Sequence, residues 1–163
     1  MRIFLIIFIL CFSVFSRAQD AFNEQVVDVE SSANEPSWIT SLEEAKKIAK
    51  EEKKPMLVYF TGSDWCTPCR KLKDDFFNTE EFVEGSESYV IVLLDIPHRD
   101  DIITLDAKKA NKSNQKKLNV SVFPTLLALD YKGKERNRIE RYSYPDPHYY
   151  WEFMKKNSKL FNL

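Results

Sequence analysis

Two cysteines three positions apart, Cys66 and Cys69, are the residues of this chain whose type and spacing most directly imply chemistry. Positions i and i+3 of a helix lie about 5 to 6 Å apart at Cβ, and a disulfide tolerates Cα separations of about 4.4 to 6.8 Å. Such a pair can close into a disulfide and reopen with little backbone movement. We consider three interpretations: a redox centre, a metal site and a structural disulfide.

A metal site is disfavoured by the number of available ligands. Structural zinc takes four ligands, and the histidines that would join the cysteine pair, His98 and His148, lie far apart in the sequence. We therefore expect no metal site. A structural disulfide remains the alternative, although closing so short a loop removes little chain entropy and stabilises a fold weakly.

The elements on either side of the pair favour redox chemistry. Residues 56–60, MLVYF, form a short apolar run typical of a strand buried on both faces, and the cysteines follow closely. A helix that begins at the cysteines presents unpaired N–H groups and the positive end of its dipole to Cys66. In such settings a thiol pKa falls from about 8.5 to between about 3.5 and 7.5. We therefore assign Cys66 as the nucleophile and Cys69 as the resolving thiol.

The rest of the chain is predicted to alternate helices and strands. Hydrophobic spacing and caps predict helices over residues 42–49, 69–77 and 106–119, another helix capped by Asn78 or Thr79, a last helix opening at residues 146–147, and strands over residues 89–96, 125–130 and 135–142. This order predicts an α/β domain in which a mixed central sheet carries helices on both faces. An extra loop is expected at residues 98–104.

The N-terminal segment differs in composition from the remainder. Residues 3–15 are almost unbroken apolar between a basic start and small residues, which is typical of a cleavable signal peptide over residues 1–18. The run is shorter than the roughly 18 residues of a membrane-spanning helix, so a retained anchor is the less favoured alternative. Its removal leaves Cys66 and Cys69 as the cysteine complement of an exported protein in an oxidising compartment.

Residues 19–36 are predicted to form a flexible acidic arm or linker, because residues 19–35 hold five acidic residues and no basic one. An added edge strand at residues 25–29, QVVDV, is the alternative. Residues 37–163 then form one domain. Lys and Arg total 24 against 25 Asp and Glu, a balance that argues against nucleic acid or a polybasic membrane-surface role.

These motifs carry a family resemblance. The segment SDWCTPC after LVYF, followed some distance later by VSVFPTLLALD, resembles the thioredoxin superfamily. More narrowly, residues 38–82 resemble exported bacterial thioredoxin-like proteins and the C-terminal periplasmic domain of the DsbD-type electron carrier. The resemblance covers residues 38–160 and implies a thioredoxin fold with no cofactor.

The resemblance implies roles for five residues around the cysteines. Pro124 corresponds to the family's proline after a cis peptide bond, and the backbone of Phe123 would then pair with an extended substrate segment. Trp65 corresponds to the tryptophan that shields the site, with core packing as the alternative. Thr67 and Pro68 stand between the cysteines; Thr67 departs from thioredoxin itself, which has glycine there, while proline at position 68 resembles the reducing branch of the family.

One departure concerns proton transfer. Classical members carry a buried acidic residue on the strand before the motif, and its place here falls on Tyr59. A phenol is protonated below about pH 10 and accepts no proton near neutrality. The proton acceptor is therefore missing or supplied from elsewhere, Asp64 being a candidate by proximity.

We therefore expect a periplasmic or otherwise exported thiol–disulfide oxidoreductase that reduces or isomerises disulfides of exported proteins. It is expected to be a monomer recharged by a membrane electron carrier, and the direction of electron flow stays open. One alternative is a client-binding adaptor or chaperone without redox turnover, suggested by the aromatic cluster at residues 142–153. Another is a dedicated cytochrome c maturation reductant. Lysines between residues 108 and 117 suit either an acidic partner or, as the simpler interpretation, a solvated helix face.

Overall fold

The structure, a computed structural model of the chain, describes residues 36–163. The predicted signal peptide at residues 1–18 and the alternative edge strand at residues 25–29 lie outside the described residues, as does the predicted arm at residues 19–36 apart from Pro36. These assignments stay predictions.

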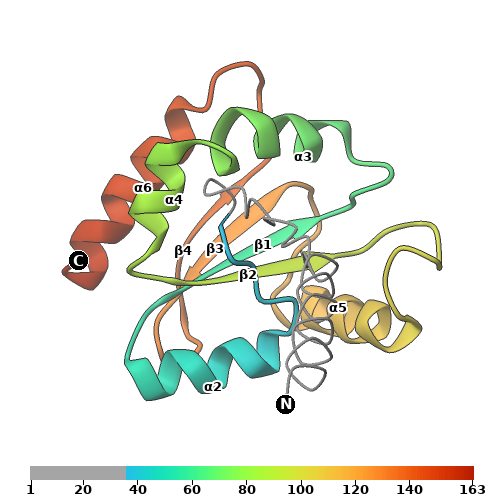
Figure 1. The fold of residues 1–163 in the computed structure, drawn as a ribbon, viewed down its shortest axis with the longest axis horizontal. Helices are drawn as coiled ribbons and strands as arrows, with labels where there is room; N and C mark the ends of the chain where they lie inside the picture. The colour runs from blue at the N-terminus through green and yellow to red at the C-terminus, as the bar shows by residue number, and fades with distance from the viewer. Residues whose placement is uncertain (1–35) are drawn as a thin grey trace, which may run out of the picture. The chain divides into compact units, whose positions relative to one another are not determined.

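A four-stranded sheet lies at the centre of the described residues (Figure 1). Its strands are β1 (Met56–Thr61), β2 (Val90–Asp95), β3 (Thr125–Leu129) and β4 (Glu135–Glu140). They are arranged in the order β2-β1-β3-β4; β1 is parallel to β2, and β3 is antiparallel to both β1 and β4. The mixed central sheet predicted from the sequence is confirmed.

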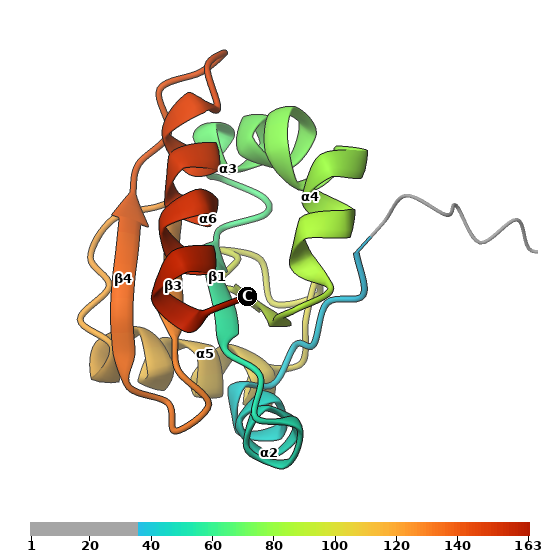
Figure 2. The same cartoon turned by 90° about the vertical axis from the view of Figure 1, so that its left-hand side faces the viewer.

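Helices cover both faces of the sheet (Figures 1 and 2). On one face lie α3 (Thr67–Leu72), the π-helical segment η2 (Lys73–Phe77), α4 (Glu80–Ser86) and α6 (His148–Phe161); on the other lie α2 (Leu42–Glu52) and α5 (Leu105–Lys117). Within this part of the chain no helix has the length and apolar character that crossing a membrane requires.

The central strand β1 serves two cores, one on each face. Leu57 and Tyr59 belong to the core that includes both cysteines, whereas Met56, Val58 and Phe60 belong to the core beneath α2. This division follows from strand geometry, since successive side chains point to opposite faces of a sheet. The unbroken apolar run MLVYF is therefore explained by burial on both sides.

Caps and backbone conformation set the limits of the elements. The Ser41 hydroxyl accepts a hydrogen bond from the Glu44 N–H at 3.3 Å, and Thr79 caps α4 in the same way. The strand predicted over residues 135–142 is shorter, because Arg141 adopts a left-handed φ of 66° directly after β4 and interrupts extended pairing.

The helix predicted through residue 77 changes its winding after α3. Segment η2 (Lys73–Phe77) is π-helical, and two consecutive aromatic residues within it, Phe76 and Phe77, are both buried. Phe76 packs against Tyr150 of α6 at 5.4 Å between ring centroids, and Phe77 packs against Tyr59 of β1 at 4.5 Å. The predicted apolar stripe is present, and it anchors the helix that starts at the cysteines.

Candidate functional site

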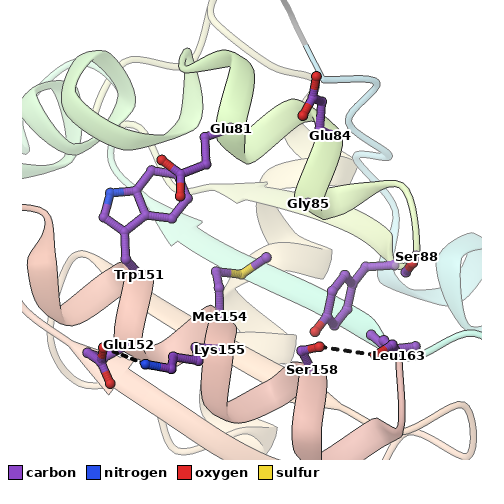
Figure 3. Close-up of a pocket in the computed structure, with 11 residues that line it drawn as sticks. Glu81, Glu84, Gly85, Ser88, Trp151, Glu152, Met154, Lys155, Ser158 and Leu163 are labelled. Carbon is purple, nitrogen blue, oxygen red and sulfur yellow. Dashed lines mark hydrogen bonds and ion pairs between the residues drawn. The ribbon is translucent and has the colours of Figure 1, made fainter.

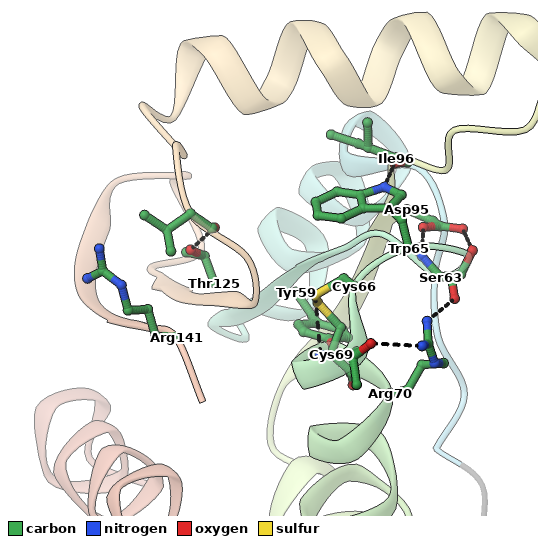
Figure 4. Close-up of a disulfide and its surroundings, with 12 residues drawn as sticks. Tyr59, Ser63, Trp65, Cys66, Cys69, Arg70, Asp95, Ile96, Thr125 and Arg141 are labelled. Carbon is green, nitrogen blue, oxygen red and sulfur yellow. Dashed lines mark hydrogen bonds between the residues drawn. A yellow bond between two sulfur atoms is a disulfide. The ribbon is translucent and has the colours of Figure 1, made fainter. Parts of the chain in front are cut away.

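Cys66 and Cys69 form a disulfide at the start of α3, with a Cα–Cα distance of 5.3 Å (Figure 4). Cys66 is the N-cap of the helix in an extended conformation, and its Sγ accepts a hydrogen bond from the Cys69 N–H at 3.3 Å. A backbone N–H that already points at this sulfur also stabilises it as a thiolate. The structure thus places the predicted nucleophile directly before the helix and the predicted resolving thiol in its first turn.

Both cysteines are largely enclosed in the disulfide form. Cys66 keeps 3% of its surface exposed and Cys69 keeps 1%, and both belong to the core on the α3 side of the sheet. Little of the surface of the predicted nucleophile Cys66 is therefore open to solvent. A group that reaches the sulfur of Cys66 in this form must be narrow.

Trp65 lies beside the disulfide and is fixed by three neighbours. Its indole N–H donates to the Ile96 carbonyl at 2.9 Å, its ring stacks on His98 at 5.1 Å, and it meets Phe123 edge-on at 5.2 Å. The backbone of Gly62 passes so close that a Cβ at this position would lie 2.2 Å from the Trp65 ring. Trp65 remains 37% exposed, so it presents a rigid aromatic surface next to the cysteines.

The other predicted substrate-binding residues flank the disulfide on two segments. Thr67 is exposed, and its Oγ1 accepts a hydrogen bond from Arg70 at 3.0 Å, while Pro68 occupies the first turn of α3. The Phe123–Pro124 peptide bond, expected to be cis, is cis in the structure. Within the described residues neither backbone group of Phe123 makes a hydrogen bond, whereas the Pro124 carbonyl accepts from the Arg141 N–H at 2.8 Å.

Tyr59 and Asp64 are both unsuited to accept a proton from Cys69. The Tyr59 hydroxyl donates to the Cys69 carbonyl at 3.2 Å, and burial raises the pKa of this phenol far above its usual range. Desolvation raises the pKa of Asp64, but hydrogen bonds from the backbone N–H groups of Arg99 and His98, each at 2.9 Å, outweigh it and hold the pKa below its ordinary value. The Asp64 carboxylate thus caps the loop beyond β2 and is not directed at Cys69.

Asp95, which the sequence analysis did not single out, lies at the carboxyl end of β2. It is 8% exposed, and its two carboxylate oxygens accept hydrogen bonds from the N–H of Ser63 at 2.9 Å and the hydroxyl of Ser63 at 2.6 Å (Figure 4). A signal was present in the sequence, since Asp95 is an acidic residue at the end of the apolar run VIVLLD.

A cavity of about 330 Å³ lies beside Cys69 and reaches Asp95. Its wall is partly apolar and partly charged, and includes Trp38, Tyr59, Ser63, Cys69, Arg70, Lys73, Phe77, Leu93 and Asp95. Of the two site cysteines, Cys69 is the one that lines it. Cys69 therefore borders a space distinct from the surface beside Trp65.

The extra loop predicted at residues 98–104 is held by Lys108 of α5. The Lys108 ammonium donates to the carbonyls of His98 at 2.9 Å and Arg99 at 3.2 Å and pairs with Asp100 at 2.6 Å. Lys108 is buried, so its assignment to a solvated helix face was wrong. Its side chain turns inward because two carbonyls and a carboxylate offer it partners there.

The predicted aromatic cluster is divided between the core and the surface. Tyr142, Tyr150 and Phe153 are buried, while Tyr144 and Tyr149 are exposed. A groove of about 430 Å³ between α4 and α6 is lined by Trp151 and Met154 together with acidic residues (Figure 3). Neither cysteine lines this groove, and most of the cluster serves packing. Residues 36–163 contain no group of three or more His, Cys, Asp or Glu placed to hold a metal ion.

Comparison with known proteins matches residues 37–131 to the Thioredoxin-like family. The disulfide bond reductase DsbH of Chlamydia pneumoniae is 30% identical over 100 residues, covering 61% of this chain and 60% of that protein. The thioredoxin-related protein DsbJ of the same organism is 28% identical over 104 residues, covering 63% and 29% respectively. The matched segment thus spans less than two thirds of each of these relatives.

Solved structures give the same result for the fold. A DsbH oxidoreductase superposes with a TM-score of 0.68 at 25% identity, covering 79% of this chain and 86% of that one. Oxidised thioredoxin O2 of Arabidopsis thaliana gives a TM-score of 0.53 at 21% identity, covering 76% and 94%. The thioredoxin fold predicted from the sequence is confirmed.

Proposed function

Because the chain belongs to the Thioredoxin-like family, we propose that it is an exported thiol–disulfide oxidoreductase that reduces or isomerises disulfides of exported proteins. One observation carries this proposal: Cys66 and Cys69 are joined as a disulfide at the start of α3, with a backbone N–H directed at the sulfur of Cys66. The similarity to the disulfide bond reductase DsbH supports electron flow from this protein to the substrate disulfide.

The reaction exchanges one disulfide for another. The thiolate of Cys66 attacks a substrate disulfide, forms a mixed disulfide with one substrate sulfur and releases the other as a thiolate. Cys69 then attacks the sulfur of Cys66, which closes the Cys66–Cys69 disulfide and releases the second substrate thiolate. Two electrons pass to the substrate, so the oxidised protein must be reduced again. A membrane electron carrier is the proposed donor, because an oxidising compartment supplies no reducing pool of its own.

The substrate is proposed to bind as an extended segment between Trp65 and Phe123. Both backbone groups of Phe123 lack a hydrogen-bond partner within the described residues, so they can pair with a passing strand. Trp65 supplies an exposed aromatic surface for side chains of that segment, and Thr67 and Pro68 form the edge beside Cys66. The small opening at Cys66 excludes bulkier folded surfaces.

We further propose that residues 1–18 direct export and are removed, that residues 19–36 form a linker, and that residues 37–163 act as a monomeric domain in the periplasm or an equivalent exported location. The apolar run near the N-terminus and the use of a cysteine pair support this proposal.

The test is insulin reduction with dithiothreitol as electron donor, using protein that starts at residue 19. Wild-type protein is expected to accelerate insulin precipitation, and Cys66→Ser is expected to abolish the acceleration. Cys69→Ser should instead accumulate a mixed disulfide with the substrate, visible as a shifted band without reductant. If wild-type and Cys66→Ser proteins behave equally in this assay, the oxidoreductase function is refuted and a client-binding adaptor is favoured instead.

A further inference from the structure

We propose that Asp95 is the proton acceptor for Cys69 during resolution of the mixed disulfide, acting through the cavity that both residues line. This inference rests on the proposed function and assigns a residue to its second step. It places the carboxylate on β2, the strand next to β1 in the sheet.

The cavity gives the two groups a common space. Its volume of about 330 Å³ exceeds several times the roughly 30 Å³ that one water molecule occupies in the liquid. Ser63, Arg70 and Asp95 supply polar groups at its wall, so water bound there has hydrogen-bond partners. A water chain can thus carry a proton from the thiol of Cys69 to the carboxylate of Asp95.

Asp95 is the one carboxylate among the described residues that lines this cavity. The other acidic side chains near the motif are engaged elsewhere. Asp64 caps the loop at His98 and Arg99, and Asp75 accepts the hydroxyl of Tyr142 at 2.6 Å. Asp64 and Asp75 are therefore directed away from Cys69, and no carboxylate of the described residues other than Asp95 lines the cavity.

The surroundings keep the Asp95 carboxylate oriented and accessible to a proton. Ser63 donates both its N–H and its hydroxyl to the two oxygens, which fixes the plane of the carboxylate but leaves further lone pairs open. Arg70 and Lys73 bring positive charge to the same cavity from α3 and η2, and the uncharged phenol of Tyr59 faces it from β1. Besides Cys69 itself, the charged and titratable groups that line this cavity are thus one carboxylate, two cations and one phenol, and Cys66 faces Cys69 outside it.

The proposed step is balanced in atoms and electrons. The thiol proton of Cys69 passes through water to Asp95 as the sulfur of Cys69 attacks the sulfur of Cys66. The bond between Cys66 and the substrate sulfur breaks, the Cys66–Cys69 bond forms, and the substrate leaves as a thiolate. The proton on Asp95 is then available to that thiolate, which returns the carboxylate to its starting charge.

The first measurement is the pH dependence of Cys69 alkylation in Cys66→Ser protein, with and without Asp95→Asn. A nearby carboxylate disfavours a thiolate, so Asp95→Asn should lower the pKa of Cys69 by about 1. Asp74→Asn, an exposed acid on η2 outside the cavity, is the matched control and should leave the pKa of Cys69 unchanged. Asp64→Asn tests the rival acceptor and should also have no effect.

The second measurement is the single-turnover rate of mixed-disulfide resolution. Loss of a proton acceptor should slow this step about tenfold or more below the pKa of Cys69, and the loss should shrink above it. If the Asp95 carboxylate acted only through its negative charge, resolution of the mixed disulfide would be faster in Asp95→Asn at neutral pH, because a larger fraction of Cys69 would be ionised. A purely structural residue would slow the step equally at every pH and leave the pKa of Cys69 in place. Either of these results overturns the inference.

A third measurement keeps Asp95 and serves if the Asp95→Asn variant does not fold. In Cys66→Ser protein the carboxyl carbon of Asp95, followed by NMR, should show a step in chemical shift at the pKa of Cys69. A flat response across that pH range would refute the coupling. These titrations require no turnover, so they test the inference separately. If wild-type protein reduces insulin and Asp95→Asn has the same kinetics, only the role of Asp95 is refuted. If wild-type protein does not reduce insulin, the proposed function is refuted.

Discussion

Replacing Gly62 by alanine tests whether Trp65 is held in place by close packing. A Cβ at this position would lie 2.2 Å from Cε2 of Trp65, with further ring atoms at 2.4 and 2.5 Å. Contacts this short cannot be tolerated, and the backbone of Gly62 is itself tied down because its carbonyl accepts the N–H of Cys66 at 2.8 Å. The ring of Trp65 must therefore move.

The cost follows from what the ring loses when it moves. The hydrogen bond to Ile96 is worth about 0.5 to 1.5 kcal/mol, and the edge-on contact with Phe123 about as much. Alanine has fewer conformations in the unfolded chain than glycine, and this difference stabilises the folded protein by about 0.4 to 1 kcal/mol. Gly62→Ala should therefore lower the free energy of unfolding by about 1 to 2 kcal/mol. It should also slow insulin reduction, because Trp65 forms one side of the proposed substrate site.

Gly85→Ala is the matched control. Gly85 lies in α4, and an added Cβ there meets no atom within 4 Å. Alanine is the better helix former by about 0.5 to 1 kcal/mol, so this variant should be more stable and fully active. Urea denaturation measures both changes, and hydrogen exchange of the Trp65 indole N–H reports the bond to Ile96. A Gly62→Ala protein with wild-type stability and a protected indole N–H would refute the packing argument.

Three further predictions concern the thiols, two buried tyrosines and the proline. In reduced protein, iodoacetamide should alkylate Cys66 well below pH 8 while Cys69 lags, and equal, high pKa values would contradict the assignment. Tyr89→Phe should raise the free energy of unfolding by about 1 kcal/mol, because the buried Tyr89 hydroxyl has no hydrogen-bond partner among the described residues. Tyr150→Phe should lower it by about 1 kcal/mol, because it removes the 2.9 Å hydrogen bond from the Tyr150 hydroxyl to the Arg141 carbonyl. Burial raises the pKa of Tyr89 to about 12, so above about pH 10, the ordinary tyrosine pKa, the phenol ionises in the unfolded chain but not in the folded protein. The free energy of unfolding of the wild type should therefore fall as pH rises from about 10 towards 12. Urea titrations at pH 9 and 11 should show a smaller fall in Tyr89→Phe. Pro124→Ala should stay folded by circular dichroism but trap mixed disulfides or lose turnover, and unchanged kinetics would exclude a substrate-facing role.

The sheet and its helices could be predicted because local patterns determine them. The run at residues 56–60 is apolar throughout, since β1 contributes to a core on each face, and the cap at Ser41 marks where α2 begins. The cysteine pair could be placed for the same reason, because a buried strand and a helix start are adjacent in the sequence. Each of these features needs only neighbours within a few positions.

The supports of the site could not be predicted, because they join residues distant in the sequence. Asp95 and Ser63 are 32 positions apart, and Asp64 lies 34 positions from His98. Spacing rules carry no information over such separations, so Asp64 was considered because it is close to the cysteines in the sequence, and Asp95 was overlooked. Lys108 was assigned to a solvated helix face for a related reason. Helical spacing separates charged positions from an apolar stripe, but it does not show that a loop distant in the sequence folds back to bind the lysine.

The two sides of the disulfide differ in how firmly they are held, and this difference indicates where a substrate enters. On one side Trp65 is bound to Ile96, and Ser63 is bound to Asp95, so the segment before Cys66 is fastened to the end of β2. On the other side Phe123 packs its ring against Trp65 while both of its backbone groups stay unpaired within the described residues. A strand that docked on the fastened side would have to break existing hydrogen bonds, whereas one that docks at Phe123 satisfies groups that lack partners. The substrate segment should therefore approach along Phe123, with Trp65 as a fixed wall.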